Sequence, residues 1–525
     1  MWPIVIAPVR WKTVALAAVL GCAVLFRLYH IEAPLVDGMP MKQVAIANKA
    51  RNVAGPPYAL FRNTFDFLDN EGHPGTLTEE FPLYVGLMGG CYRLFGEHEW
   101  FGRAWSILAT AIAIAAFYDL VRLSSSPERA LVAAFLFSMC PLLLFYGRSF
   151  QPDPSMLACM LATAAFYQRY LLDGRRRWWI AAALAGMLGP LFKNYALMVL
   201  IPLADRTRRH MGWSALIRPG FVLLSMVMAA PVMVWTALVF VQSPNPAETN
   251  TYFLFKMPEL LWQAPLYERF FDRFLYKDCG PITALLLLVG VWAALFRKAR
   301  VEGLAAWTFM GLLFYFLLGP KLLCHDYYGL MLLPAAALWG ALGWQSLWNL
   351  SRAGTYAART SVCCCLTVLV AVALVHSPWI MKSKFEMESG FAILGKRLDE
   401  LCSASTKVIA IGSTFPVEIV HYSHHQGWVI VSDKPLAPDW RSVFANYRSL
   451  GARYLAIYLN GAVTEAERQS YLPLLHSAHV VEHSTGPWST RRRPAEYFIL
   501  DLNGAVLDQP DEPAQDSHAK VTIWP

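Results

Sequence analysis

The chain has 525 residues, of which 56% are hydrophobic and only 16% are charged. Because soluble domains carry roughly 25% charged residues, this composition excludes an ordinary soluble protein and indicates that lipid is the main solvent. The net charge of +8 does not indicate nucleic-acid binding, since the Arg and Lys residues lie in short clusters between apolar runs rather than on one continuous face.

The apolar runs recur from Trp11 to Trp379, and a run of about 20 residues is long enough to cross a hydrocarbon core of roughly 30 Å. The first run has no small-residue cleavage site, so it predicts a retained helix rather than a signal peptide. Basic clusters between the runs mark the loops expected in the cytoplasm. Helices placed between these clusters give about eleven spans, at 11–29, 103–122, 129–147, 153–172, 177–191, 194–204, 216–241, 279–296, 303–320, 328–348 and 360–378.

Two long loops then lie on the outer side, at 30–102 and 242–278. The apolar run Leu83–Phe95 in the first loop is too short to span, and we expect it to be interfacial or re-entrant. This map predicts a polytopic α-helical membrane domain over residues 1–379, with the first outer loop included. The N-terminus is expected in the cytoplasm.

Residues 380–525 are more polar and of ordinary domain size. Strand-like runs at 408–413, 428–433, 454–459 and 497–502, with a helical candidate at 416–425, predict an α/β domain outside the cytoplasm. Its tail at 509–518 is rich in Pro, Asp and Gln, which predicts disorder.

Ionisable residues gather in the turns that the charge map places outside. Such residues are costly at membrane depth, so each is a functional candidate. A carboxylate there can act as a general base toward a hydroxyl, and cations can hold a phosphate leaving group. Transfer of a sugar from a lipid phosphate uses both. The candidates are Asp37, Arg148, Asp153, Lys193, Lys321, His325 and Asp326.

Each candidate also has a purely structural interpretation. Asp37 precedes a predicted helix at 41–51 and Asp153 one that begins at Pro154, and a carboxylate commonly caps a helix N-terminus. Lysines near helix ends reach lipid head groups, and His and Tyr are common at the membrane interface. That second interpretation covers Lys193, Lys321, His325, Tyr327 and Tyr328.

Six motifs in chain order resemble the bacterial relatives of protein O-mannosyltransferases and of the lipid A aminoarabinose transferases, over roughly residues 20–340. They are Pro34-Leu-Val-Asp-Gly38 with Lys42-Gln43 and Ala50-Arg-Asn52; Glu79-Glu-Phe-Pro-Leu-Tyr84; Leu94-Phe-Gly96 with Arg103; Tyr146-Gly-Arg-Ser-Phe-Gln-Pro-Asp153; Lys193-Asn-Tyr195; and His325-Asp-Tyr-Tyr328 with Pro334. The resemblance implies a GT-C fold, a polyprenyl-phosphate sugar donor, and transfer on the periplasmic side of the bacterial inner membrane.

The resemblance also implies roles for residues of this chain. Asp37 matches the first-loop acidic residue that is the usual candidate base, and Glu80 matches the acidic residue before the proline. Two positions depart from the family: Gly38 stands where a second acidic residue is common, and Phe81 stands where the aminoarabinose transferases carry lysine, which puts that substrate in doubt. The expected catalytic residues are Asp37, Glu80 and Asp153; the phosphate-binding residues Lys42, Arg148, Lys193, Lys321 and His325; and the substrate-binding residues Tyr84, Tyr327 and Tyr328.

The sequence therefore predicts an inverting glycosyltransferase whose partners are the lipid-linked donor, an extracytoplasmic glycan, lipid or protein acceptor, and the bilayer. Asp37 accepts the acceptor's proton, or only orients an acceptor that is already an ionised phosphate. No cofactor is expected. The resemblance leaves a divalent metal open, because related oligosaccharide-transferring enzymes use one, but the sequence has no clear ligand cluster and does not predict it. A transporter or flippase, suggested by the short segments around Lys193, and a non-catalytic envelope-assembly protein are the alternatives.

Overall fold

The structure is a computed structural model that divides into two compact units. The first unit comprises Met1–Ile31, Glu79–Leu83 and Gly102–Lys382, and the second comprises Glu32–Thr78, Tyr84–Phe101 and Ser383–Pro525. The described residues are 11–58, 60–61, 64–76, 80–242, 264–299, 303–412, 416–431, 439–461, 463–464, 468–469, 471–488 and 494–503. The tail predicted to be disordered lies outside them.

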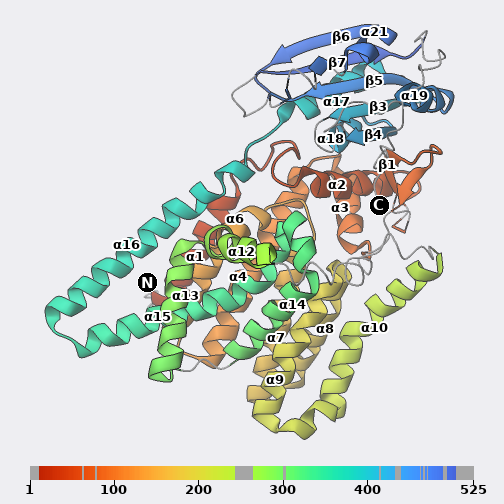
Figure 1. The fold of residues 1–525 in the computed structure, drawn as a ribbon. Helices are drawn as coiled ribbons and strands as arrows, with labels where there is room; N and C mark the ends of the chain where they lie inside the picture. The colour runs from red at the N-terminus through yellow and green to blue at the C-terminus, as the bar shows by residue number, and fades with distance from the viewer. Residues whose placement is uncertain are drawn as a thin grey trace, which may run out of the picture. The chain divides into compact units, whose positions relative to one another are not determined.

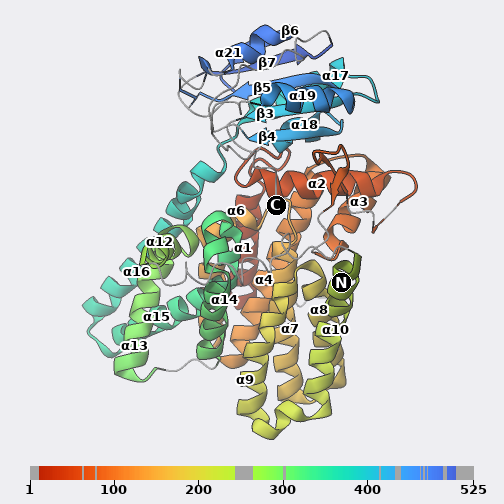
Figure 2. The same cartoon turned by 45° about the vertical axis from the view of Figure 1, so that its right-hand side comes forward.

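The first unit is helical (Figures 1 and 2). Several of its helices begin with proline. Proline is common at the first helical position because the backbone N–H that it lacks would have no partner within the helix there. The helices are α1 (Trp11–Arg27), α4 (Trp100–Ser124), α5 (Pro127–Ser138), α6 (Pro141–Tyr146), α7 (Asp153–Asp173), α8 (Arg176–Phe192), η1 (Asn194–Val199), α9 (Leu200–Met211), η2 (Trp213–Ile217), α10 (Pro219–Gln242), α12 (Ala264–Asp272), η5 (Arg273–Asp278), α13 (Pro281–Arg297), α14 (Leu304–Cys324), η6 (Asp326–Leu332), α15 (Leu333–Ala353), α16 (Tyr356–Ile380) and η7 (Lys382–Lys384).

These helices follow the predicted apolar runs closely. The run at 129–147 is divided, since α5 and α6 break where Pro141 removes a donor. The expected span at 194–204 is likewise divided between η1 and α9, and the one at 328–348 begins in η6 and continues in α15. Among the described residues, four helices are long and apolar enough to cross a membrane, and a fifth counts if the bent pair Phe270–Asp278 and Pro281–Arg297 is one span. The number of eleven spans stays a prediction.

Helices α13 and α15 approach each other backbone to backbone. A Cβ atom added to Gly343 would lie 1.9 Å from the carbonyl oxygen of Leu286, and one added to Gly290 would lie 2.2 Å from that of Trp339. Small residues permit such close helix contacts inside membranes. The contact fixes α15, whose N-terminal end follows directly on η6.

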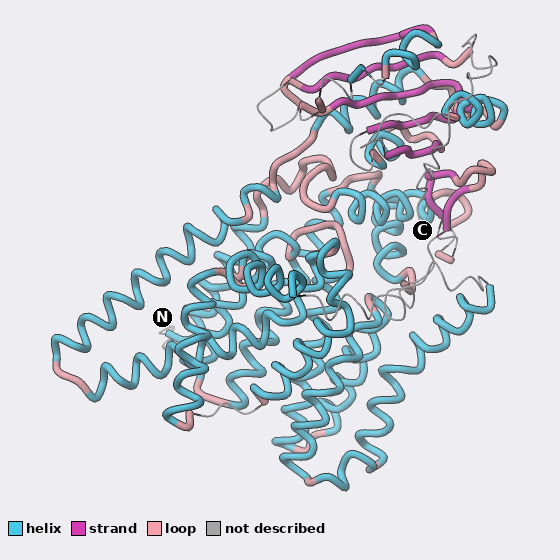
Figure 3. Tube along the Cα trace, in the orientation of Figure 1, coloured by secondary structure: helices cyan, strands magenta, loops and turns pink. Residues whose placement is uncertain are grey.

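The second unit contains a seven-stranded sheet in the order β2-β1-β4-β3-β5-β7-β6 (Figure 3). The β1, β4, β3 and β5 strands run parallel, and β7, β6 and β2 pair antiparallel with their neighbours. Buried apolar side chains cover both faces. The strands are β1 (Thr64–Leu68), β2 (Pro74–Thr76), β3 (Lys407–Gly412), β4 (Gly427–Val431), β5 (Ala452–Leu459), β6 (His479–Gly486) and β7 (Ala495–Asp501); the helices are α2 (Pro40–Ala54), α3 (Leu83–Phe95), α17 (Ser389–Leu401), α18 (Val417–Tyr422), α19 (Trp440–Ser449) and α21 (Leu472–Ser477).

The four predicted strands are present as β3, β4, β5 and β7, whereas β1, β2 and β6 were not predicted. The division after Lys382 lies close to the predicted boundary at residue 379. Most of the first outer loop, residues 32–78 and 84–101, nevertheless groups with the C-terminal region rather than with the membrane helices, and only residues 79–83 group with the helices. The reason is pairing: Phe67 of β1 lies in parallel register with Gly427 of β4. In addition, Leu35 N donates to the Tyr422 hydroxyl at 2.7 Å.

Two buried titratable residues lie on α18. Glu418 is 1% exposed, and its Oε2 has no hydrogen-bond partner in the described part of the chain. Burial raises the pKa of Glu418 to about 8. His421 is also 1% exposed; burial, helped by the nearby Arg51 charge, lowers the pKa of His421 to about 3. Both residues are therefore neutral over a wide pH range around 6.

This pair predicts how the stability of the second unit depends on pH. The folded state binds the Glu418 proton more tightly than the unfolded state, so this stabilisation is complete below about pH 4.5 and is lost as pH rises to about 8. The His421 contribution is complete above about pH 6.5 and is lost as pH falls toward 3. The two slopes oppose each other between about pH 4.5 and 6.5, where we expect the wild type to be most stable.

The Glu418→Gln variant tests this expectation in thermal unfolding from pH 4 to 9. Without the carboxyl, the decline above pH 6.5 disappears, and at pH 8 the variant gains on the order of 5 kcal/mol at most over the wild type. The matched control is Glu71→Gln, which changes an exposed glutamate of the same unit and should follow the wild-type curve. A Glu418→Gln curve that also follows the wild type would contradict the assignment.

Candidate active site

The centre of the candidate site in the first unit is Lys193, which lies where α8 ends and η1 begins. The residue has extended backbone there, with φ −162°, and its side chain is 1% exposed. Its Nζ lies 2.8 Å from Asp153 Oδ1 and 3.9 Å from Glu80 Oε1. The side chain of Lys193 therefore does not reach toward lipid head groups; it forms a buried ion pair with the first residue of α7.

Aromatic rings surround the Lys193 ammonium group. Its Nζ lies 4.4 Å from the ring centroid of Tyr327, 4.9 Å from that of Tyr328 and 6.0 Å from that of Tyr195. Rings within about 6 Å attract a cation through their π faces. Tyr327 and Tyr328 are 3% and 4% exposed, so they are core residues of the site rather than interface aromatics. The His325 ring packs 5.6 Å from Tyr327, centroid to centroid.

A second network of charges lies beside this cluster; it joins the candidate Asp326 to Arg273 and Asp278, which were not predicted. Arg273 Nη2 lies 2.9 Å from Asp326 Oδ2, and Arg273 Nε lies 3.3 Å from Asp278 Oδ1. The hydroxyl of Tyr315 donates to Asp278 Oδ2 at 3.1 Å. Tyr146 donates to Asp326 Oδ1, and its ring packs edge-on against Tyr327 at 5.8 Å.

Sequence reasoning missed Arg273 and Asp278 because residues 242–278 looked like one loop. The available signal was the pair of charged dipeptides, Asp272-Arg273 and Lys277-Asp278, immediately before the apolar run that begins at residue 279. Charges at the edge of a span are functional candidates on the same ground as those in the shorter turns.

Arg148 has a different environment from the one predicted. The side chain is fully buried, and its Nη2 donates to the carbonyl oxygen of His30 at 2.9 Å. Arg103 Nη1 donates to the same oxygen at 3.2 Å and to that of Ile31 at 3.1 Å. These two arginines thus hold the turn after α1, in which His30 has the left-handed φ of 55°. A phosphate-binding role for Arg148 stays a prediction.

The predicted residues of the first outer loop belong to the second unit. Asp37 is 3% exposed, and its Oδ1 accepts a hydrogen bond from Gln43 Nε2 at 2.8 Å. The same Gln43 group donates to the Gly38 carbonyl at 3.2 Å, and Gly38 N donates to the Lys384 carbonyl at 2.7 Å. Asp37 is therefore held in one orientation. Lys42 lies in the first turn of α2 and buried Tyr84 in α3. Lys321 is in α14, but its side chain lies outside the described part.

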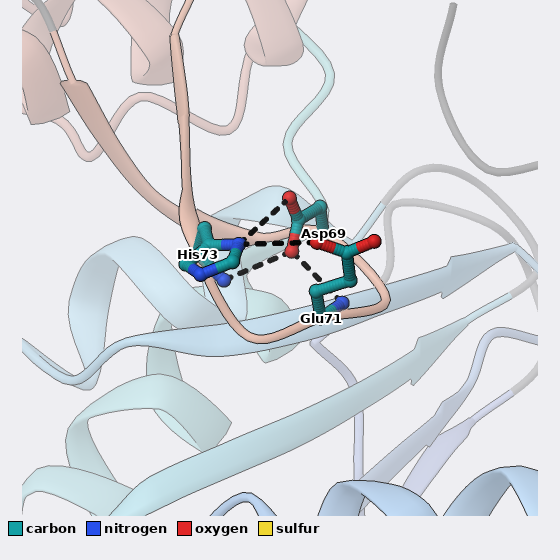
Figure 4. A group of neighbouring side chains, drawn as sticks. All are labelled: Asp69, Glu71 and His73. Carbon is teal, nitrogen blue, oxygen red and sulfur yellow. Dashed lines mark hydrogen bonds and ion pairs between the residues drawn. The ribbon is translucent and has the colours of Figure 1, made fainter.

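One group of possible metal ligands occurs among the described residues, at the turn between β1 and β2 (Figure 4). Asp69, Glu71 and His73 are all exposed, and His73 Nδ1 lies 3.6 Å from Asp69 Oδ2 and 3.5 Å from Glu71 Oε2. Asp69 Oδ1 accepts from the backbone N–H groups of Glu71 and His73. These hydrogen bonds shape the turn, and we assign the group no functional role.

Comparison with known proteins supports the resemblance seen in the motifs. Residues 74–235 match the family model described as dolichyl-phosphate-mannose-protein mannosyltransferase. No curated protein sequence matches the chain. The structure is similar to that of ArnT from Cupriavidus metallidurans bound to undecaprenyl phosphate, with a TM-score of 0.62 and 14% identity over 96% of this chain and 100% of that chain.

Two further solved structures share the fold. The oligosaccharyltransferase AglB from Archaeoglobus fulgidus, in complex with an inhibitory peptide and a dolichol-phosphate, gives a TM-score of 0.58 and 12% identity over 95% of this chain and 75% of that chain. The arabinofuranosyltransferase AftD from Mycobacteria gives a TM-score of 0.55 and 14% identity over 94% of this chain and 40% of that chain. The chain therefore has the GT-C fold of these membrane glycosyltransferases, as the motifs predicted.

Proposed function

We propose that the protein moves a sugar from a polyprenyl-phosphate donor to an acceptor on the outer side of the bacterial inner membrane. The observation that carries the proposal is the buried ion pair between Lys193 and Asp153. Glu80 Oε1 lies 3.9 Å from the same Lys193 Nζ, and tyrosine rings pack against that ammonium group. The fold supports it, because ArnT of the same fold was solved bound to undecaprenyl phosphate and AglB in complex with a dolichol-phosphate.

The donor phosphate is assigned to the Lys193 ammonium group. Glu80 is the looser of its two carboxylate partners, and the Glu80 side chain is 31% exposed, whereas that of Asp153 is 2% exposed. A phosphate that takes the place of Glu80 keeps the buried pair intact and gains a desolvated cation, which stabilises the charge that develops on the leaving group. Arg273 supplies a second cation, through its pair with Asp326 beside Tyr146 and Tyr327.

The reaction is an inverting displacement. The acceptor oxygen bonds to the anomeric carbon from the face opposite the phosphate, the bond from that carbon to the phosphate oxygen breaks, and the polyprenyl phosphate leaves. Asp37 takes the acceptor's proton when the acceptor is a hydroxyl, and it orients an acceptor that is already an ionised phosphate. The role of Asp37 rests on its matching first-loop motif and on its fixed, buried carboxylate.

The remaining predicted residues have the same roles in the proposal as in the prediction from sequence. Lys42, Lys321 and His325 are further cation candidates for the phosphate, and Tyr84, Tyr327 and Tyr328 are candidates for contact with the sugar or the lipid. Tyr327 and Tyr328 already present π faces to Lys193, so they shape the space next to the proposed phosphate position. The transfer needs no cofactor in this scheme.

The test is an assay of the purified full-length protein with a panel of labelled polyprenyl-phosphate sugars and an extract of envelope lipids and glycans. We expect one donor to lose its sugar to an acceptor, and the product to name that acceptor. Omission of the acceptor extract is the control for simple hydrolysis. Label that crosses the membrane of proteoliposomes while still attached to its lipid carrier would instead identify a flippase, and no transfer from any donor by folded protein would refute the proposal.

A further inference from the structure

The short helix η5 (Arg273–Asp278), which precedes α13, is a π-helix rather than an α-helix. Cys279 N donates to the carbonyl oxygen of Phe274 at 3.0 Å, which is the i to i+5 bond of that conformation. In an α-helix, residues i and i+5 lie about 140° apart around the axis, because each residue turns by about 100°. The wider π turn instead lets the first and last residues of η5 meet: Arg273 Nε lies 3.3 Å from Asp278 Oδ1.

The carboxylate of Asp278 is fixed by the elements around it. Asp278 is 1% exposed, and its Oδ2 accepts from the Tyr315 hydroxyl of α14 at 3.1 Å. Gly329 of η6 packs against the same oxygen, since a Cβ atom added there would lie 2.7 Å from it. Tyr315 is held in turn, because its ring packs edge-on against Phe270 of α12, with 4.3 Å between the centroids. Asp278 is therefore an anchored partner for Arg273.

Arg273 joins this anchor to the candidate active site. Its side chain is 25% exposed, and its Nη2 lies 2.9 Å from Asp326 Oδ2. Asp326 is followed directly by Tyr327, whose ring centroid lies 4.4 Å from Lys193 Nζ. The guanidinium group is planar and rigid, so a carboxylate that holds Nε also sets the direction of the two Nη groups. Asp278 thus orients the edge of Arg273 that reaches toward the cluster around Lys193.

The two cations of the site are held in the same way. Lys193 Nζ lies 2.8 Å from Asp153 Oδ1, and the Asp153 side chain is 2% exposed. Each cation therefore has one almost fully buried carboxylate partner. Long basic side chains lose much rotational freedom when they bind a ligand, and a side chain that is already fixed loses less. A buried carboxylate beside each cation prepares it for an anionic ligand by this mechanism.

We propose that Asp278 is a positioning residue for the transfer, which orients the Arg273 guanidinium toward the phosphate of the lipid-linked donor. The inference rests on the proposed function, in which Arg273 is a second cation beside Asp326 and Tyr327. Asp278 is buried and does not contact the donor in this scheme. Its effect on the donor therefore passes through Arg273 alone, and the π turn of η5 is what brings the two residues together.

The experiment measures binding of undecaprenyl phosphate to the purified full-length protein by native mass spectrometry, and sugar transfer in the panel assay. Asp278→Asn keeps an oxygen for the Tyr315 hydroxyl but removes the charge that pairs with Arg273. We expect undecaprenyl phosphate to bind about tenfold more weakly and the KM for the donor to rise by a similar factor, the effect of one hydrogen bond between charged groups. The KM for the acceptor should not change.

The matched control is Asp272→Asn, which removes an exposed carboxylate one residue before η5. The Asp272 side chain makes no capping hydrogen bond to η5, so this variant should bind and transfer like the wild type. A loss as large as that of Asp278→Asn would assign the effect to charge at this end of the helix and would overturn the proposal.

A double variant separates positioning from folding. Arg273→Gln should weaken binding of undecaprenyl phosphate, and adding Asp278→Asn to it should cause no further loss, because the residue that Asp278 orients is already gone. Two losses that multiply would show that Asp278 acts on the fold, and wild-type binding by Asp278→Asn would exclude any role. If Asp278→Asn does not fold, Tyr315→Phe tests the same anchor with both charges kept. We expect it to bind about threefold more weakly, and unchanged binding would overturn the proposal.

Failure of the proposed function gives a different pattern. Wild-type protein that does not bind undecaprenyl phosphate would refute both the function and the role of Asp278. Binding that weakens as expected in Asp278→Asn, without transfer from any donor, would support the positioning role and refute the transferase. Transfer by the wild type that Asp278→Asn leaves unchanged would refute the positioning role alone.

Discussion

The Asp37→Asn variant is expected to transfer sugar about 10²–10⁴-fold more slowly than the wild type, the usual contribution of a positioned general base. The substitution removes the proton acceptor but keeps the shape of the side chain. The new amide still offers an oxygen to Gln43 Nε2, which donates to Asp37 Oδ1 at 2.8 Å in the wild type. The loop should therefore stay in place, and the loss should appear in kcat. The measurement is the initial rate of product formation with the donor found in the panel assay.

The matched control is Asp69→Asn, which changes a half-exposed carboxylate of the same loop and should leave the rate unchanged. Asp37→Glu keeps the carboxylate and should recover part of the activity. An Asp37→Asn protein that unfolds at the wild-type temperature and transfers at the wild-type rate would remove Asp37 as the base while leaving the enzyme in place. Loss of both rate and thermal stability would instead point to a structural role in the loop.

The Lys193→Met variant is expected to lose stability and transfer together. Without the ammonium group, Asp153 is left as a buried carboxylate whose side chain is 2% exposed, and breaking such a pair from one side costs about 3–5 kcal/mol. The cation assigned to the donor phosphate disappears as well, for which we expect a loss of about 10²–10³-fold in kcat. Thermal unfolding and the transfer assay measure the two effects separately.

The double variant Lys193→Met with Asp153→Asn distinguishes the two effects. Removing both charges abolishes the uncompensated carboxylate, so most of the lost stability should return, and the interaction energy in this cycle should be large. Transfer should not return, because the phosphate still lacks its cation. A double variant with wild-type transfer would show that Lys193 serves only the fold. One no more stable than Lys193→Met would show that the pair is not what holds α7 to the turn after α8.

The helices were predictable because bilayer thickness imposes a length on every apolar run. The expected span at 153–172 corresponds to α7 (Asp153–Asp173), and the expected span at 11–29 corresponds to α1 (Trp11–Arg27). The edge strand β6 (His479–Gly486) was missed because most of its residues are exposed and carry no apolar alternation. The short β1 strand was missed for a different reason, since its parallel partner lies far away in the chain.

Some members of the cluster around Lys193 were candidates from the sequence, but their pairing was not. The rule that basic loops face the cytoplasm placed Asp153, Lys193 and Tyr327 on one side of the bilayer, and the structure brings these three together. No local pattern showed that Lys193 pairs with Asp153 across 40 residues. The contact of Arg148 with the carbonyl oxygen of His30 could not be predicted either, because every residue has a backbone carbonyl and the sequence does not show which one accepts.

The pairing of β1 with β4 has a consequence for how the chain is made. Trp428 Nε1 donates to the carbonyl oxygen of Asp69 across 359 residues. Ribosomes add about 5–20 residues per second, so β1 waits roughly 20 to 70 s for its partner strand. During that interval one edge of β1 carries unsatisfied backbone groups, which other strands and proteases recognise. A nascent chain that stalls before residue 427 therefore keeps β1 as an unpaired edge strand, the kind of edge with which other strands can pair.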